Sequence, residues 1–292
     1  MAKTNNTDFY QEVTNKIIDA LEQGVKPWQC PWREDVVAGL PLNFSTQNEY
    51  RGMNIMLLWM STQLNGYSSA QWLTFKQAIA NGGKVRKGEK GTRIFFYKMV
   101  EKEQDGKKEE YPMLKTYVVF NLDQIEGIEV VSDELTEEVS AEDVDTLDEV
   151  ESFLHATGAD IRYGGQKAFF RPSTDEIVIP DRHRFSETAD LYATILHELT
   201  HWTGHKSRLN RESKGGFGSK DYAFEELVAE LGSAFLMADL GIKGEVQHES
   251  YIASWLQALK SDKRYIFKAA TMAMKAHEYL KAYKDVQHSH AA

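Results

Sequence analysis

Apolar residues recur at the spacing of amphipathic helices in several segments of the chain, and β-branched or aromatic residues cluster in shorter segments between them. The helices predicted by this spacing cover residues 9–23, 51–64, 73–80, 187–203, 222–240, 251–259 and 265–283. The predicted strands cover residues 93–99, 117–121, 161–170 and 176–179. In the second half, strands come first and helices follow, which is the order of an α+β domain.

An acidic segment separates the two halves. Residues 126–151 hold twelve Asp or Glu and no Lys or Arg, and without these acids the net charge of −10 would become +2. Like charges with few apolar anchors favour a linker over a packed element. We therefore predict an α+β protein of two domains, residues 1–129 and 146–292, joined by an acidic linker over residues 130–145. The alternative is a solvated acidic helix that begins near residue 141.

The composition indicates the cellular compartment of the protein. The single cysteine, Cys30, rules out an internal disulfide and fits a reducing compartment. No apolar run is long enough to cross a membrane, and residues 1–10 lack the apolar core of a signal peptide. We therefore expect a cytoplasmic protein that does not contact a membrane.

The segment Pro27–Trp32 is predicted to be a rigid loop that displays its two indoles.

The first half also contains a basic stretch. From Lys76 to Lys98 there are seven Lys or Arg against the single acid Glu89, with aromatic residues and glycines interleaved. Cations that follow a phosphate backbone, together with aromatic rings that stack on bases, hold single-stranded nucleic acid. The candidate DNA-binding residues are Trp72, Lys76, Lys84, Arg86, Lys87, Lys90 and Arg93. The alternative is that the aromatic residues form a core and the basic loop is only solvated.

The second half carries a metal-binding motif, HExxH, on a predicted helix. His197 and His201 stand four residues apart, so both imidazoles can face one ion from the same side of the helix. Glu198 lies beside them, where it can act on water rather than as a ligand. Because the helix is rich in leucine and isoleucine, we expect it to be partly buried, and a salt-bridged surface helix is the weaker interpretation.

The third ligand is predicted on the helix over residues 222–240. Glu226 and Glu230 stand one turn apart on one face, so one can bind the ion while the other accepts an N–H from a ligand imidazole. We assign Glu226 as ligand and Glu230 to the supporting position, with the reverse as the alternative. His205 is a weaker candidate because it follows the motif next to the predicted end of the helix. Two His and one Glu leave an open fourth position, as in catalytic zinc sites. The expected cofactor is Zn²⁺, with another divalent metal as the alternative.

The HELTH motif followed by a pair of carboxylates at ExxxE spacing resembles the gluzincins, the thermolysin class of metallopeptidases. This resemblance implies that Glu198 is the general base. It also implies a His or Tyr that stabilises the oxyanion, for which Tyr222 and His183 are both candidates. Two arginines that follow the motif, Arg208 and Arg211, are predicted to be solvated or to contact DNA.

Longer segments resemble the ArdC-type antirestriction proteins of conjugative plasmids, whose N-terminal domain also heads certain TraC-type plasmid primases. The similarity lies in PWQCPW and WLTFKQAIANGGKVRKGEKGT in the first half, and in HELTHWTGHKSRLNR and YAFEELVAELGSAFL in the second. It implies an N-terminal domain that binds single-stranded DNA, a C-terminal zincin-like metallopeptidase domain, and a role in protecting incoming plasmid DNA from restriction.

Three functions remain open at this point. The protein could shield single-stranded DNA and use the metal only for structure or regulation. It could be a protease that is recruited by DNA and cleaves a host protein such as a restriction enzyme subunit. It could also be an interaction module whose basic loop binds an acidic partner, including its own linker. An intact Glu198 favours the protease, because a purely structural metal site does not need that carboxylate.

Overall fold

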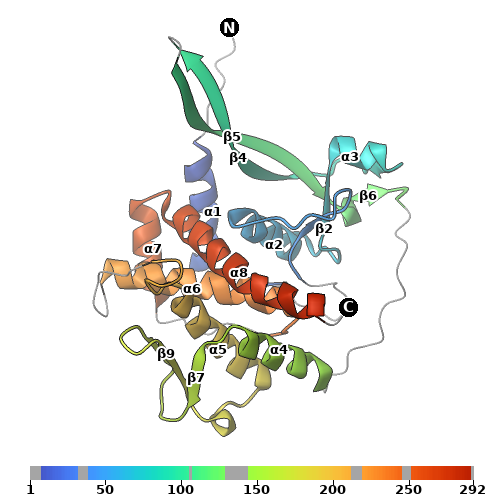
Figure 1. Ribbon diagram of the computed structural model, residues 1–292. Coiled ribbons are helices and arrows are strands. Elements are labelled where there is room, and N and C mark those ends of the chain that lie inside the picture. Colours follow the sequence, from blue (N-terminus) through green and yellow to red (C-terminus); the bar gives the residue numbers. More distant parts are fainter. Residues whose placement is uncertain are drawn as a thin grey trace. The chain divides into compact units, whose positions relative to one another are not determined.

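The computed structural model describes residues 8–31, 39–104, 107–128, 144–211, 219–244 and 251–290 (Figure 1). The chain divides into two compact units, one made of Met1–Trp32 with Asp133–Ala292 and the other of Arg33–Ser132. Each unit combines helices with a sheet, so the prediction of two domains of mixed helix and sheet is confirmed. Nearly all of the predicted acidic linker lies outside the described residues.

The unit Arg33–Ser132 is built on a four-stranded sheet in the order β1-β2-β5-β4. Strand β2 runs antiparallel to β5, and β5 forms a long antiparallel ladder with β4. A second, two-stranded sheet pairs β3 with β6. The strands are β1 (Leu42–Asn43), β2 (Gln71–Thr74), β3 (Lys84–Val85), β4 (Thr92–Gln104), β5 (Lys107–Asn121) and β6 (Ile125–Glu126).

Two helices cover the two faces of β2. Helix α2 (Met53–Asn65) ends at Gly66, which has φ 66°, and its Leu58 packs with Trp72 in one core cluster. Helix α3 (Phe75–Ala80) lies over the other face, where Ala78 packs with Leu73. Alternate residues of a strand point to opposite faces, which is why Trp72 and Leu73 enter different clusters.

The predicted helix over residues 73–80 is wrong in its first part. Leu73 is fully buried and pairs with Phe120 across the ladder, so residues 71–74 form the strand β2. The helix begins after Thr74, whose hydroxyl accepts from the backbone N–H of Gln77 while the Gln77 side chain accepts from the N–H of Thr74. This reciprocal capping box marks a helix start that the apolar spacing alone did not locate.

The other unit contains a three-stranded sheet in the order β7-β9-β8, with β7 (Asp160–Tyr163), β8 (Phe169–Arg171) and β9 (Glu176–Ile179). The single strand predicted over residues 161–170 is therefore two strands. The interruption falls at Gly164 and Gly165, whose φ values are 148° and 77°. Positive φ is accessible to glycine and breaks the extended run.

Helices pack on this sheet and on one another. They are α4 (Val144–Ala156), α5 (Thr188–Thr203), α6 (Lys220–Asp239), α7 (Ile252–Ser261) and α8 (Tyr265–His290). Leu196 of α5 and Leu236 of α6 belong to one buried cluster with Ile177 of β9. Helix α4 begins within the range that was predicted as linker, as the acidic-helix alternative allowed.

Helices α5 and α6 approach each other closely, and this approach positions the site. A side chain at Gly232 would lie 2.5 Å from Cγ2 of Thr200, so only glycine fits there. The neighbouring Ser233 donates to the carbonyl oxygen of Ala193 at 3.0 Å. This close packing brings residues of α6 next to the motif on α5.

Helix α1 (Phe9–Glu22) packs in the same unit as α5 and α6. The hydroxyl of Thr14 donates to the carbonyl oxygen of Lys263 at 2.8 Å, and the ring of Tyr10 meets that of Phe267 edge to face at 4.8 Å. The compact units thus differ from the predicted domain of residues 1–129 at its N-terminal end. Apolar spacing identified the helix correctly but carried no information on which core it would join.

Candidate metal centre and nucleic-acid interface

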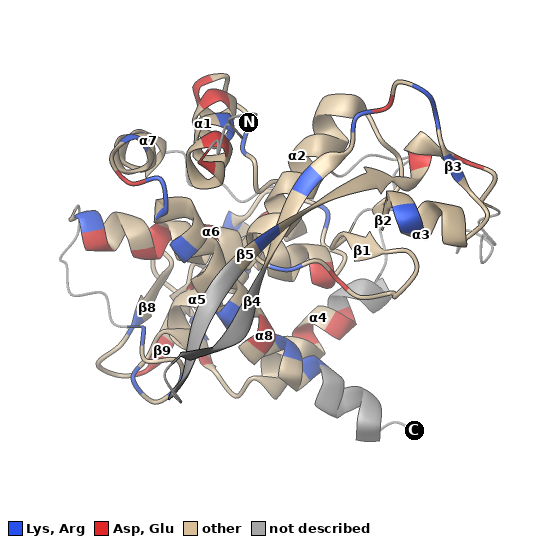
Figure 2. Ribbon diagram, turned by 90° about the horizontal axis from the view of Figure 1, so that it is seen from above, with Lys and Arg blue, Asp and Glu red and all other residues tan. Residues whose placement is uncertain are grey.

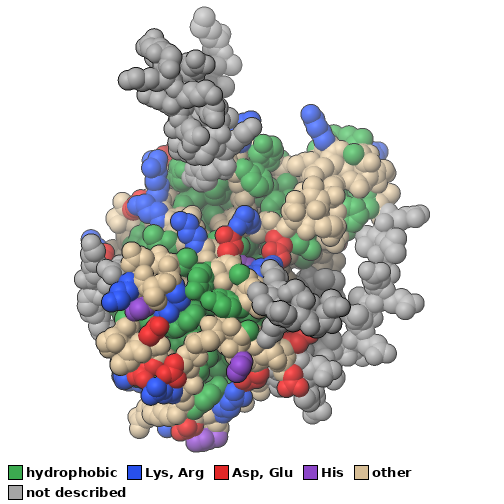
Figure 3. Space-filling model, viewed as in Figure 1, with side chains coloured by type: hydrophobic (Ala, Val, Ile, Leu, Met, Phe, Trp, Pro, Cys, Tyr) green, Lys and Arg blue, Asp and Glu red, His purple; other side chains and the backbone are tan. Residues whose placement is uncertain are grey.

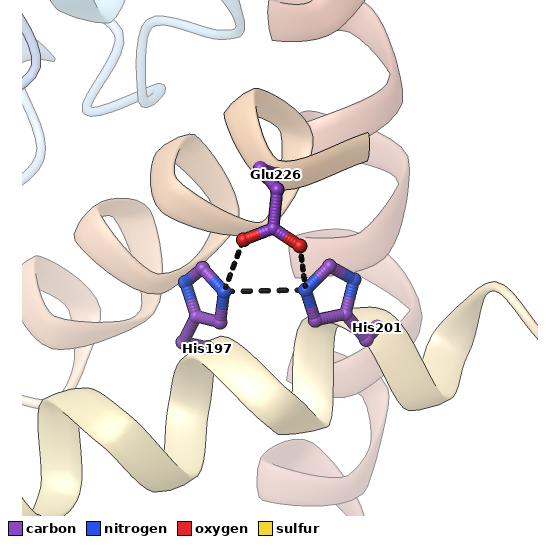
Figure 4. Close-up of side chains that lie close together, drawn as sticks. All are labelled: His197, His201 and Glu226. Atoms are coloured by element: carbon purple, nitrogen blue, oxygen red, sulfur yellow. Dashed lines mark hydrogen bonds and ion pairs between the residues drawn. The ribbon is translucent and has the colours of Figure 1, made fainter. Parts of the chain in front are cut away.

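Three predicted ligands meet at the contact of α5 and α6. Figure 4 shows His197 and His201 on α5 and Glu226 on α6, with their side chains directed at one point. The two Nε2 atoms lie 3.2 Å apart. The carboxylate of Glu226 reaches both rings, with Oε2 3.7 Å from Nε2 of His197 and Oε1 3.4 Å from Nε2 of His201. His197 and Glu226 are buried, and His201 is half-buried.

These distances fit a single ion. Ligands bound at 2.0–2.1 Å in a tetrahedron stand about 3.3 Å from one another, close to the separations found here. Imidazole nitrogen and carboxylate oxygen are also ligand types that zinc and similar divalent ions prefer. The residues present therefore fit a divalent metal, and three protein ligands leave one coordination position for a substrate or water.

Charge at the site favours a cation. Burial lowers the pKa of His201, but hydrogen bonds with Glu225 and Glu226 and the charge of Glu198 outweigh it and raise this pKa to about 10. Burial raises the pKa of Glu226, but hydrogen bonds with both imidazoles outweigh this and hold the pKa well below its ordinary value. A cluster that holds a proton this firmly will also attract a metal ion in its place.

A second carboxylate supports His201, and it is not the one predicted. Oε1 of Glu225 lies 3.2 Å from Nδ1 of His201. Arg211 donates to both oxygens of Glu225 and also to the carbonyl oxygen of Thr200. Glu225 is adjacent to Glu226, but a helix turns about 100° between neighbours, so sequence spacing gave no reason to place both at the site.

The arginines after the motif are not solvated. The side chains of Arg208 and Arg211 are only 7% and 8% exposed. Arg208 pairs with Asp175 and stacks over the ring of Trp202, 3.8 Å from the ring centroid. The prediction that these arginines are solvated or contact DNA is therefore wrong. Both are folded into the segment that leaves α5.

Glu230, the predicted supporting residue, lies next to His197. Its Oε2 is 4.0 Å from Nδ1 of His197, and its Oε1 accepts from the indole Nε1 of Trp28 at 3.2 Å. Trp28 is only 2% exposed, so the prediction that this loop displays its indoles is wrong for Trp28. The second indole, Trp32, lies outside the described residues.

Four other residues were candidates for a role at the site. Glu198 is buried next to the ligands on α5, and its charge acts on His201. Tyr222 lies one turn before Glu226, and its hydroxyl forms hydrogen bonds with Tyr251 and Glu226. Burial, together with these contacts, raises the pKa of Tyr222, so it stays a hydrogen-bond donor. His183 is exposed in a short 3-10 helix. His205 forms a hydrogen bond with Ser207 at 2.7 Å and does not belong to the group of His197, His201 and Glu226.

In the other unit, the predicted basic residues lie at the surface. Lys76, Lys84, Lys87, Lys90 and Arg93 are exposed, and Arg86 is exposed but pairs with Glu89 at 3.0 Å. Figure 2 shows Lys and Arg, in blue, on α3, on β3 and on the loop that follows β3. This arrangement offers phosphates a cationic edge.

Trp72 is not part of that surface. It is fully buried between α2 and the sheet, where it meets Tyr67 edge to face. The prediction that Trp72 contacts DNA is therefore wrong. Gly83 and Gly91 also serve packing, since a side chain there would lie 2.5 Å from Ile128 and 2.4 Å from Val118.

Other aromatic rings are exposed instead. Phe75 at the start of α3 is 53% exposed and meets Phe120 edge to face at 6.4 Å. Phe96 and Tyr117 are 47% and 42% exposed and form a second edge-to-face pair. Phe120 and Tyr117 are three residues apart on β5, so the two pairs lie on opposite faces of the strand. In Figure 3, green hydrophobic side chains reach the surface around α3.

Two family models match the chain. One, described as a zincin-like metallopeptidase, matches residues 148–272. The other, described as the N-terminal domain of anti-restriction factor ArdC, matches residues 7–120. Within the described residues, no helix is long and apolar enough to span a membrane.

Relatives match along most of the chain. The uncharacterized protein y4eC of Sinorhizobium fredii (strain NBRC 101917 / NGR234) is 37% identical over 288 residues, which cover 94% of this chain and 92% of that protein. A DNA primase TraC of Escherichia coli is 38% identical over 301 residues, which cover 96% of this chain but only 27% of the primase. The chain thus spans about a quarter of the length of that primase.

Two solved structures are similar to this chain along nearly its whole length. The metal-free crystal structure of antirestriction ArdC protein from plasmid R388 has a TM-score of 0.82 and 43% identity, and the match covers 95% of this chain and 98% of that one. Its Mn(II)-bound structure has a TM-score of 0.78 and 41% identity with the same coverage. With both domain models matched and similarity along nearly its whole length, the chain belongs to the ArdC family of antirestriction proteins.

Proposed function

We propose that this protein counters restriction of incoming plasmid DNA, that it binds single-stranded DNA through the unit Arg33–Ser132, and that its metal centre is a working zinc peptidase site. The observation that carries the peptidase assignment is the buried carboxylate of Glu198 beside a three-ligand site. A structural metal site does not need a further carboxylate beside its two His and one Glu ligands. The relatives named ArdC support the antirestriction role.

The chemistry divides among residues of this chain. A bound divalent ion polarises a peptide carbonyl and makes nearby water more acidic. Glu198 takes the proton from the attacking water and passes it to the leaving amine. Tyr222 contacts Glu226 and keeps its proton, so it can donate to the oxygen on which negative charge develops. His183 is the weaker candidate for that role because it is exposed on a short 3-10 helix, whereas Tyr222 forms a hydrogen bond with Glu226.

Binding of single-stranded DNA is assigned to the edge formed by α3, β3 and the loop after β3. Lys84 and Lys87 are exposed there, close in sequence to Lys76 on α3. Phe75 is the exposed ring nearest to these cations along the chain, and we propose it as the base platform in place of Trp72. Cationic side chains with an exposed ring form the usual surface for single strands.

The test of the peptidase assignment is Glu198→Gln, which removes the base but keeps the size of the side chain. Metal content, single-stranded DNA affinity and protection of a plasmid from restriction during transfer are measured beside wild type. The exposed Glu149→Gln on α4 is the matched control. We expect Glu198→Gln to retain metal and DNA binding and to lose protection.

The alternative outcome has an equally definite meaning. If Glu198→Gln keeps its metal and still protects as wild type does, cleavage is not needed and the DNA-binding unit protects by shielding. If protection is lost, the protein acts as a DNA-recruited peptidase, and its substrate can be sought by trapping host proteins, restriction enzymes among them, on the inactive variant.

A further inference from the structure

The N-terminal segment of the chain reaches the metal centre through Trp28. The indole is 2% exposed and meets the ring of Trp255 on α7 edge to face at 5.5 Å. Its Nε1 donates to Oε1 of Glu230 at 3.2 Å. Glu230 is itself 1% exposed, so this is a charge-assisted hydrogen bond in a buried environment.

Glu230 faces a metal ligand with its other oxygen. Oε2 lies 4.0 Å from Nδ1 of His197, the ring nitrogen opposite the one that faces Glu226. A histidine that binds metal through one nitrogen donates its other N–H to a carboxylate or carbonyl in most metalloproteins, and this contact fixes the ring orientation. At 4.0 Å the two atoms are too far apart for a hydrogen bond, so Glu230 would take for His197 the role that Glu225 takes for His201 once the two groups move together on metal binding.

A buried carboxylate needs donors to hold its position. Without the indole N–H, the buried carboxyl group of Glu230 would have one hydrogen bond fewer, and it would move toward other donors or water. Either movement changes the angle at which Oε2 meets His197. The Trp28 contact thus bears on His197 through Glu230.

We propose that Trp28 is a positioning residue of the metal centre, acting through Glu230 on His197. This proposal rests on the proposed function only in that the site binds a divalent ion. It also assigns part of the segment matched by the ArdC N-terminal domain model, residues 7–120, to the metallopeptidase machinery.

The competing explanation is that Trp28 only fills the core. Two variants separate the explanations. Trp28→Phe keeps an aromatic ring and removes the N–H that Glu230 accepts. Trp255→Phe removes an indole N–H from the same aromatic cluster, but that N–H bonds to the carbonyl oxygen of Ala223 at 2.8 Å and not to Glu230. Both should lower the melting temperature of the metal-free protein.

The deciding measurement is Zn²⁺ affinity of the full chain, determined by competition with a chromophoric chelator. Loss of a direct partner of a metal ligand weakens binding by about 10–100-fold, so an indirect partner should cost roughly three- to tenfold. We expect this loss for Trp28→Phe and an affinity within about twofold of wild type for Trp255→Phe. In a Glu230→Gln background, Trp28→Phe should cause no further loss, because the residue through which it acts has already been changed.

A spectroscopic measurement covers the case in which Trp28→Phe does not fold. In the wild-type protein labelled with ¹⁵N, the indole N–H resonance of Trp28 should shift when Zn²⁺ is added, and that of Trp255 should move much less. Equal zinc affinities for the two tryptophan variants, full additivity with Glu230→Gln, or an unmoved Trp28 resonance would each overturn the proposal. Wild-type protein that binds neither Zn²⁺ nor Mn²⁺ would overturn the proposed peptidase function as well. Loss of protection in Glu198→Gln alone leaves the Trp28 proposal unaffected.

Discussion

Arg211 donates through two nitrogens to the carboxylate of Glu225, and its side chain is buried at the point where the chain leaves α5. Because Glu225 also bonds with Nδ1 of His201, this pair fixes a metal ligand from outside the ligand set. The planar guanidinium matches both oxygens at once, which a lysine ammonium cannot do.

We expect Arg211→Lys to weaken Zn²⁺ binding by about tenfold while the protein stays folded. Loss of the fork contact leaves Glu225 free to rotate away from His201. Zinc affinity by chelator competition is the measurement. Arg162→Lys is the control, because Arg162 makes a similar two-oxygen contact with Asp160 at an exposed position away from the site. Equal effects of the two changes would contradict this role for Arg211.

The stability of the metal-free protein should depend on pH through His201. Its folded pKa, about 10, lies above the ordinary value of 6.5, so its contribution is fully present below pH 6.5 and is lost as pH rises toward 10. Glu226 has a lowered pKa, so its contribution is present above its ordinary value of 4.5 and is lost in acid. The melting temperature of EDTA-treated protein should therefore fall between pH 7 and pH 10.

Metal affinity should change in the opposite direction over that range, because the ion must displace the proton held by His201. Zinc titrations at several pH values check this, and proton release on binding can be followed with an indicator dye. In His201→Gln the decline of metal-free stability toward pH 10 should be smaller. A wild-type stability that stays flat over this range would show that the carboxylates do not hold a proton on His201.

Phe75→Ala should weaken binding of single-stranded DNA by about 1–3 kcal/mol, the usual contribution of one stacked base, with little change in stability. Tyr117→Ala tests the opposite face of β5 in the same way. Leu64→Ala is the control, since Leu64 is 76% exposed and apolar but is not aromatic. A larger loss for Tyr117→Ala than for Phe75→Ala would indicate that the DNA binds to the other face of the strand.

By contrast, Trp72→Ala should lower the free energy of unfolding, by roughly 3–5 kcal/mol.

Charge reversal at Lys87 should weaken DNA binding for all sequences and reduce its dependence on salt, because a phosphate contact releases a counterion. Arg86→Glu should have an additional effect on the fold. Arg86 pairs with Glu89, which also accepts from the side-chain amide of Gln124. Melting curves recorded beside binding curves at several salt concentrations separate the two effects.

Ile17→Ala should destabilise the unit that carries the metal centre, by about 2–5 kcal/mol. Ile17 is fully buried on α1, and α1 packs in that unit. The exposed Ile79→Ala on α3 is the matched control. Calorimetry that resolves the two units would show which one responds. A response of the unit Arg33–Ser132 alone would contradict the assignment of α1.

The sequence by itself determined the local features of this protein. The HExxH spacing placed two imidazoles on one side of a helix, and ExxxE spacing placed Glu226 one turn from Glu230, because helical periodicity relates residues three or four apart. His197, His201 and Glu226 lie close enough together to hold one ion, and their role as ligands stays a prediction. Most helix ranges and the strand at residues 176–179 also follow from local apolar patterns and turn residues.

Only the tertiary structure decided which distant segments share a core. The sequence analysis chose Trp72 as the stacking residue, but Trp72 is covered by α2, and Phe75 is the ring that is exposed at the start of α3. The metal centre also includes Glu225, Arg211 and Trp28, which come from different segments of the chain. The periodicity of a helix or strand relates only residues a few positions apart, so it could not predict these contacts. Burial and long-range pairing depend on how elements pack, and packing is a property of the whole unit rather than of any window of the chain.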